Sequence, residues 1–150
     1  MSPPPPPPPP PPDKDPSHWL YRLTAAEWLA AADTELEHAA EAFDRRAVRP
    51  GVTHARRAAG MAWNAVLVLA ADERYGRSYM EHVVALAADE DAPADARAAA
   101  ALLRDTPPAP PALVTIGKAD TAPVDAARLI VALARARVAA RQAGAAGEPQ

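Results

Sequence analysis

The stretch that decides the fold is Thr53 to Tyr75, THARRAAGMAWNAVLVLAADERY. It begins polar and basic, becomes apolar on every side over residues 66–71, and ends charged. A run of this length indicates a helix, and an apolar centre on all sides indicates that neighbours bury it. We therefore predict the central helix of an all-α domain. Gly76 should end this helix, because glycine tolerates positive φ. Asn64 inside it could bond a neighbouring helix or face solvent, and the second interpretation is favoured.

Another helix is predicted before this stretch, from Thr24 to about Ala47. Thr24 and Glu27 form a capping-box pattern, in which each side chain can accept a hydrogen bond from the other residue's backbone N–H. Apolar residues then recur at helical spacing. Pro50 and Gly51 are expected to stop the helix. Because the link is short, the two helices should form an antiparallel hairpin.

Three further helices are predicted after the central one. A capping-box pattern at Ser78 predicts a helix from Tyr79. Pro93 fits the first turn of a helix that runs to about Arg104. The last helix is expected from residue 120 to about residue 144. The predicted fold class is therefore all-α, a five-helix bundle built on a long antiparallel helical hairpin.

The N-terminal segment has an unusual composition, since residues 3–12 are all proline. Such a run favours the polyproline II helix. One interpretation is a ligand for domains that bind proline-rich segments, and the one favoured at this stage is a stiff disordered tail. We predict a disordered tail over residues 1–17, a helical domain over residues 18–143 and a second disordered tail over residues 144–150.

Composition and motifs exclude several classes of function. The chain has no cysteine, a formal net charge of -3 and no apolar run of the length that a membrane span needs. The N-terminus lacks the basic-then-apolar order of a signal peptide, so we predict a cytoplasmic protein without membrane contact. No phosphate-loop, dinucleotide, zinc-protease or nucleophile-elbow motif is present. Four histidines without cysteine partners do not predict a metal site, and no cofactor is expected.

One basic cluster surrounds the predicted hairpin link. Its members are Arg45, Arg46, Arg49, His54, Arg56 and Arg57. The cluster could bind phosphate, RNA or an acidic partner, because concentrated positive charge attracts anions. The alternative interpretation is that Arg45 and Arg46 complement the dipole at the C-terminus of the first helix. Both interpretations stay open at this point.

A second candidate site lies at the start of the third helix, in the stretch RSYMEHVVALA, where four residues separate Arg77 from His82. On this stretch and on the order of its helices, the chain resembles the HEPN superfamily over roughly residues 23–141. Many HEPN ribonucleases carry an Arg-x(4–6)-His motif, usually completed across a dimer, and cleave RNA without a metal. The resemblance implies that Arg77 would stabilise phosphate charge and that His82 would act as general acid or base.

Other HEPN domains have no catalytic activity and serve as binding modules. Val84 stands where the ribonucleases often have a tyrosine, two residues after the histidine. The expected function is therefore a non-enzymatic HEPN-like module that binds a protein partner, a nucleotide or RNA, with a homodimer as a further expectation. The alternatives are a metal-independent endoribonuclease that uses Arg77 and His82, and a helical adaptor whose proline tail recruits the partner.

Overall fold

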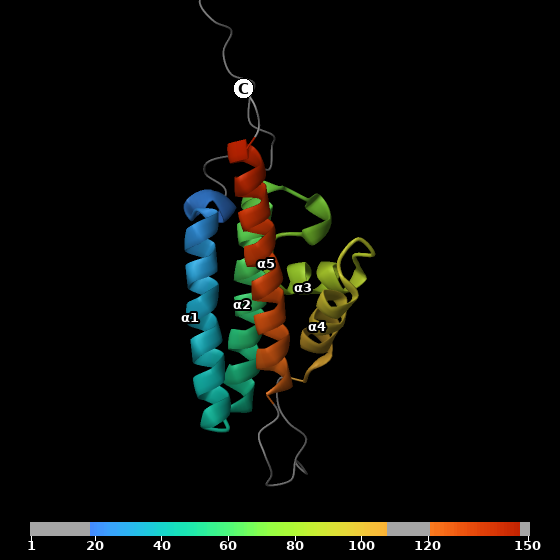
Figure 1. Cartoon of the computed structure of the whole chain (residues 1–150). Coiled ribbons are helices and arrows are strands. Elements are labelled where there is room, and N and C mark those ends of the chain that lie inside the picture. Colours follow the sequence, from blue (N-terminus) through green and yellow to red (C-terminus); the bar gives the residue numbers. More distant parts are fainter. Residues whose placement is uncertain (1–18, 108–120, 148–150) are drawn as a thin grey trace, which may run out of the picture.

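The computed structural model describes residues 19–107 and 121–147, and within them the architecture is all-helical (Figure 1). The α-helices are α1 (Ala25–Asp44), α2 (Val48–Leu69), α3 (Tyr79–Ala88), α4 (Ala94–Asp105) and α5 (Ala122–Gly147). Two short 3-10 helices, η2 (Trp19–Arg22) and η3 (Glu73–Tyr75), complete the described elements. The predicted all-α fold of five helices is confirmed for the described residues.

The helices α1, α2 and α5 run alongside one another, and α3 and α4 pack on a second side of α2 and α5 (Figure 1). The fully buried part of α2 is residues 58–65, where Ala58, Ala62 and Ala65 are completely covered. Burial on all sides was predicted for residues 66–71, but there only Leu67 is buried, because α2 ends at Leu69 and Ala71 is exposed. Gly60 lets α3 come close to α2, because a Cβ at this position would lie 2.3 Å from Cβ of Tyr79. Small residues on this part of α2 therefore let the helix backbones approach closely.

The turn between the first two helices differs from the prediction. The Thr24 capping box is present, but α1 ends at Asp44, and Pro50 and Gly51 lie inside α2 instead of stopping α1. Proline is tolerated there because the N–H groups of a first helical turn have no intrahelical acceptor. The chain reverses instead at Arg46, whose φ is +60°.

The end of α2 is also earlier than predicted. The helix stops at Leu69, and the segment up to Tyr75 is not its continuation but a loop followed by η3. The side chain of Asp72 accepts a hydrogen bond from the backbone N–H of Arg74 and so caps η3. Gly76, with φ +68°, therefore ends η3 and not the central helix.

The last helix is longer than predicted, since α5 continues through Gly147. The prediction of a disordered tail from residue 144 is thus wrong for residues 144–147. Gly144 does not have a positive φ, so it does not act as a left-handed cap that would end the helix. The alanines that follow it favour helix. Two segments lie outside the described residues: the tail predicted over residues 1–17, and residues 148–150 of the predicted C-terminal tail. Among the helices described, none is both long enough and apolar enough to cross a lipid bilayer.

Candidate functional site

His82 lies in the core of the bundle, where α3 faces α2. Its side chain is 1% exposed. Nδ1 lies 2.6 Å from the backbone carbonyl oxygen of Tyr75, and Nε2 lies 2.7 Å from the side-chain amide of Asn64. The ring of Trp19 stacks against the imidazole, with 6.4 Å between ring centroids. Both ring nitrogens of the predicted catalytic histidine are therefore engaged by the protein itself.

The protonation state of His82 follows from this burial. Removal from water lowers the pKa of His82, although the Tyr75 carbonyl and the charge of Glu81 oppose the change. The neutral ring has a single N–H, and it belongs on Nδ1 because the carbonyl can only accept. In the structure Oδ1 of Asn64 lies at Nε2. With the ring proton on Nδ1, Nε2 must accept, so this tautomer requires the Asn64 amide to be turned by 180° so that its NH2 group donates to Nε2.

Asn64 corrects one expectation from the sequence. The favoured interpretation, a side chain that faces solvent, is wrong: Asn64 is 0% exposed and bonds a neighbouring helix, which was the other possibility. A buried amide needs a hydrogen-bonding partner, and His82 supplies one for one end of the Asn64 amide. The amide nitrogen of Asn64 has no hydrogen-bond partner among the described residues. The contact between Asn64 and His82 nevertheless joins α3 to α2.

Arg77 occupies a different environment from His82, because it is exposed on the segment just before α3. Its backbone N–H donates to the carboxylate of Glu81 at 3.0 Å, so Glu81 completes the capping of α3 together with Ser78. No ion pair joins the guanidinium of Arg77 to any residue in the described ranges. The structure therefore separates the two residues of the motif, one in solvent and one in the core.

A cleft of about 560 Å³ opens beside Arg77. Two segments of the chain form the cleft. The first consists of η2 and the start of α1, and the second is the start of α3. Within the first segment, the indole N–H of Trp28 donates to the carbonyl of Leu20 at 2.9 Å and so holds η2 against α1. The lining residues are Trp19, Arg22, Leu23, Trp28, Arg77, Ser78 and Tyr79. Aromatic walls beside two exposed cations suit a ligand that combines a flat ring with an anionic group.

The basic cluster predicted at the hairpin link does not form one surface. Arg56 crosses to α4, where its guanidinium donates to the carbonyls of Leu103 at 2.8 Å and Thr106 at 2.6 Å. It thus satisfies carbonyl groups that the C-terminus of a helix leaves without partners. Its role in the described structure is to hold α4 against α2.

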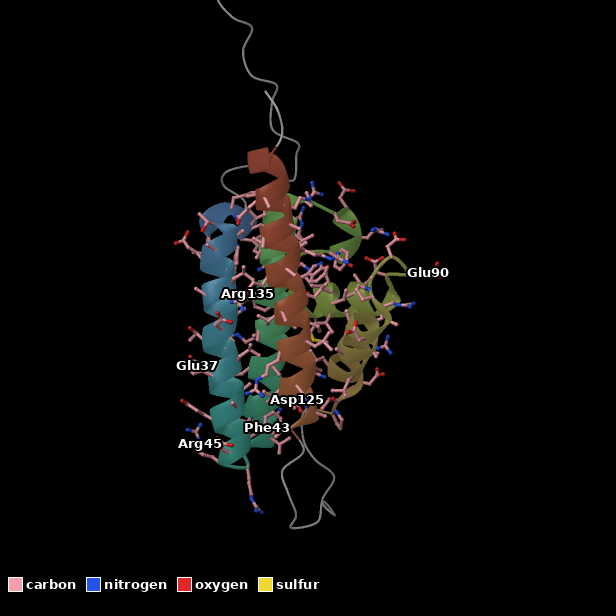
Figure 2. All side chains as sticks on the ribbon, in the orientation of Figure 1. Glu37, Phe43, Arg45, Glu90, Asp125 and Arg135 are labelled. Atoms are coloured by element: carbon pink, nitrogen blue, oxygen red, sulfur yellow. The ribbon has the colours of Figure 1, made fainter. Side chains whose placement is uncertain are left out.

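His54 and Arg57 face α1, where both pair with the carboxylate of Glu35. The remaining members, Arg45, Arg46 and Arg49, are exposed near the turn that follows α1, where Figure 2 labels Arg45. The predicted cluster is therefore divided among three places, and only its three arginines at the turn keep a common exposed location.

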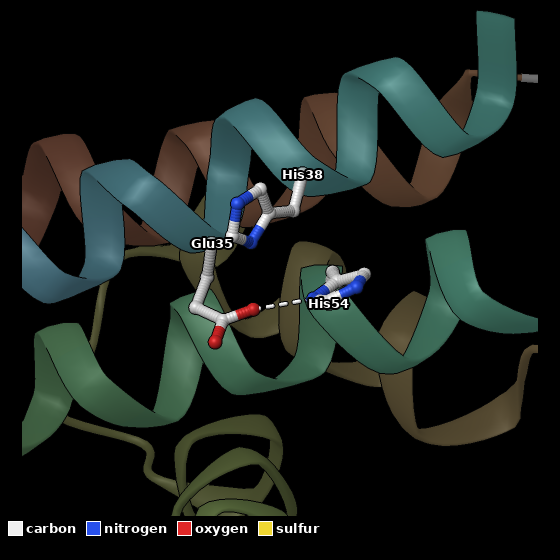
Figure 3. Close-up of side chains that lie close together, drawn as sticks. All are labelled: Glu35, His38 and His54. Atoms are coloured by element: carbon white, nitrogen blue, oxygen red, sulfur yellow. Dashed lines mark hydrogen bonds and ion pairs between the residues drawn. The ribbon is translucent and has the colours of Figure 1, made fainter.

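A cluster that the sequence reasoning missed lies between α1 and α2. Figure 3 shows Glu35 and His38 on α1 pointing toward His54 on α2. Oε2 of Glu35 lies 2.5 Å from Nδ1 of His54, and Oε1 lies 3.2 Å from the guanidinium of Arg57. The two imidazole rings meet edge to face, with centroids 5.1 Å apart.

Two signals in the sequence could have revealed this cluster. Glu35 and His38 have the i, i+3 spacing that puts two side chains on one helix face. His38 and His54 are equally far in sequence from Arg46, where the hairpin turns, so an antiparallel register brings them opposite each other. A count of histidines and cysteines does not contain this register, so it does not predict the cluster.

Comparisons with known proteins assign no relatives to the chain. No protein-family model matches it, and neither a curated protein nor a solved structure is significantly similar.

Proposed function

We propose that this chain is a non-enzymatic HEPN-like helical module that binds a nucleotide or a nucleotide unit of RNA in the cleft between η2 and α3. The observation that carries the proposal is the cleft itself, where Trp19 and Tyr79 lie beside Arg22 and Arg77. Its volume of about 560 Å³ falls within the range usual for small-molecule sites, roughly 300–1,000 Å³.

Each group in the cleft has a role that fits this ligand. Aromatic side chains stack on bases without much preference for their identity. Arginine provides a planar fork of N–H donors that matches phosphate oxygens. Neither Arg22 nor Arg77 forms an ion pair with the described residues, so no internal partner must be displaced when an anion binds.

The alternative, RNA cleavage by Arg77 and His82, has less support. A general acid or base must come within hydrogen-bonding distance of the proton that it transfers. In the described conformation, Tyr75 and Asn64 hold both nitrogens of His82. Catalysis would require the imidazole to leave these two partners and reach the cleft.

The test is a titration of the full chain with a fluorescent single-stranded RNA and, separately, with ATP and inorganic phosphate. Arg22→Gln and Arg77→Gln remove one charge each from the cleft. The matched control is Arg45→Gln, which removes an equal charge at the other end of α1, about 30 Å away for a helix of this length.

We expect saturable binding that both cleft variants weaken and the control does not. If RNA is the ligand, each lost phosphate contact should lower the slope of log affinity against log salt by about 0.7. Binding of ATP with the same variant pattern, but not of RNA, would identify a free nucleotide. Equal affinity of the parent and Arg77→Gln, or weakening only by Arg45→Gln, would refute the cleft as the site.

A further inference from the structure

We infer that Glu35, His38 and His54 form a binding site for a divalent transition-metal ion of the zinc class, separate from the cleft. The three side chains offer one carboxylate oxygen and two imidazole nitrogens, and these atoms all lie within 4.8 Å of one another. Two histidines and one glutamate are a ligand set that zinc uses in proteins, with further positions left for water.

The helices position the ligands for this task. Glu35 and His38 share one face of α1 at i, i+3 spacing, an arrangement that helical bundles use to direct a Glu-x-x-His pair at a metal. His54 comes from α2 on the facing side of the hairpin (Figure 3). The site is therefore built from two packed helices, which hold ligands more rigidly than loops do.

Two adjustments separate the observed arrangement from a coordination sphere, because donor atoms that lie up to 4.8 Å apart must move closer and one short contact must open. Ligand atoms about 2.0–2.1 Å from one tetrahedral zinc ion lie roughly 3.3 Å apart. The 2.5 Å contact between Glu35 and His54 must therefore open by under about 1 Å. His54 is partly exposed, with 28% of its side chain accessible, and it can move by this amount without disturbing the core.

Burial and the contact with Arg57 orient the carboxylate of Glu35 toward His54. The side chain of Glu35 is only 10% exposed, and Arg57 donates to Oε1, which orients Oε2 toward His54. Such outer contacts fix the orientation of ligating carboxylates in metal sites. His38 is exposed, so an ion can enter from the solvent side of the cluster.

The opposing interpretation is that Glu35, His54 and Arg57 form an ion-pair network only. The two interpretations differ in the role of His38, for which the described structure contains no hydrogen bond to Glu35 and only an edge-to-face contact with His54. In an ion-pair network His38 is dispensable, whereas in a metal site it is a ligand. Replacing His38 therefore separates them.

The experiment uses the full chain after treatment with EDTA and removal of the chelator. Cobalt(II) is added first, because its visible absorption reports coordination by nitrogen and oxygen, and zinc competition then gives the zinc affinity. The variants are His38→Gln and Glu35→Gln. The matched control is His18→Gln, a histidine outside the described residues, and the absence of cysteine removes thiolates as competing ligands.

We expect one saturable site per chain and a melting temperature that rises with zinc, since a ligand that binds only the folded state stabilises it. His38→Gln should weaken the affinity by at least about tenfold, because even changes outside the ligand set weaken metal sites by roughly 10–100-fold. His18→Gln should bind like the parent. Absence of saturable binding by the parent, unchanged affinity of His38→Gln, or loss of binding in His18→Gln would overturn the inference.

Discussion

The replacement His82→Gln tests whether the predicted catalytic histidine is a neutral structural group. Glutamine keeps an amide in place of the imidazole but cannot join both Tyr75 and Asn64 in the same way. Leaving a buried polar partner unsatisfied costs about 1–3 kcal/mol. We therefore expect the variant to be about 2 kcal/mol less stable than the parent near neutral pH.

The pH dependence gives the sharper test. Burial lowers the pKa of His82 below the ordinary histidine value of 6.5, so under mildly acidic conditions the unfolded chain binds a proton that the folded chain does not. Stability contributed by this residue is thus present above pH 6.5 and is lost as the pH falls. Between about pH 7.5 and about pH 5.5, the loss should reach up to about 1 kcal/mol. The variant lacks this loss, so the stability gap between parent and variant should narrow on acidification.

The assay is urea denaturation of both proteins at these pH values, followed by tryptophan fluorescence. Subtracting the free energy of unfolding of the variant from that of the parent removes the contributions of all other titrating groups that the replacement leaves unchanged. A gap that stays constant or widens as the pH falls would mean that the folded state holds a protonated His82, and the structural assignment would fail.

Three replacements test the helix contacts, each by urea denaturation. Arg56→Ala should cost about 2 kcal/mol, because it leaves C-terminal carbonyls of α4 without their charged donor; the exposed Arg49→Ala should change stability by less than about 0.5 kcal/mol, and equal effects would contradict this division. Gly60→Ala should cost about 1–3 kcal/mol, because the new Cβ would overlap Tyr79; a neutral result would disprove the close approach of α3. Arg46→Gly should stabilise the protein by about 0.5–1 kcal/mol, because it relieves a left-handed backbone at φ +60°; a loss of stability would argue against that turn.

The sequence predicted the fold class and several helix starts because these depend on local chemistry. The Thr24 capping box and the start of α3 at Tyr79 are present as expected, since caps involve residues only three positions apart. Helix ends were predicted less well. Pro50 can stop one helix or occupy the first turn of the next, and the local sequence does not distinguish these two positions.

The candidate sites depend on contacts between helices, which the sequence does not state. Arg56 belonged to a basic cluster by proximity in sequence, yet it bonds carbonyls 47 and 50 residues away. Asn64 and His82 become partners only after α3 folds onto α2. The cleft likewise joins residues 19–28 to residues 77–79, so only the tertiary structure brings its aromatic and basic groups together.

The most direct test of the account is incubation of the full chain with labelled single-stranded RNA in EDTA, with binding and strand integrity measured in the same samples. The parent, Arg77→Gln and His82→Gln are compared after each is shown to be folded. The account predicts that the parent binds RNA and leaves it intact, that Arg77→Gln binds more weakly and that His82→Gln also leaves the RNA intact. Cleavage by the parent that both replacements abolish would contradict it and would identify Arg77 and His82 as parts of a ribonuclease site.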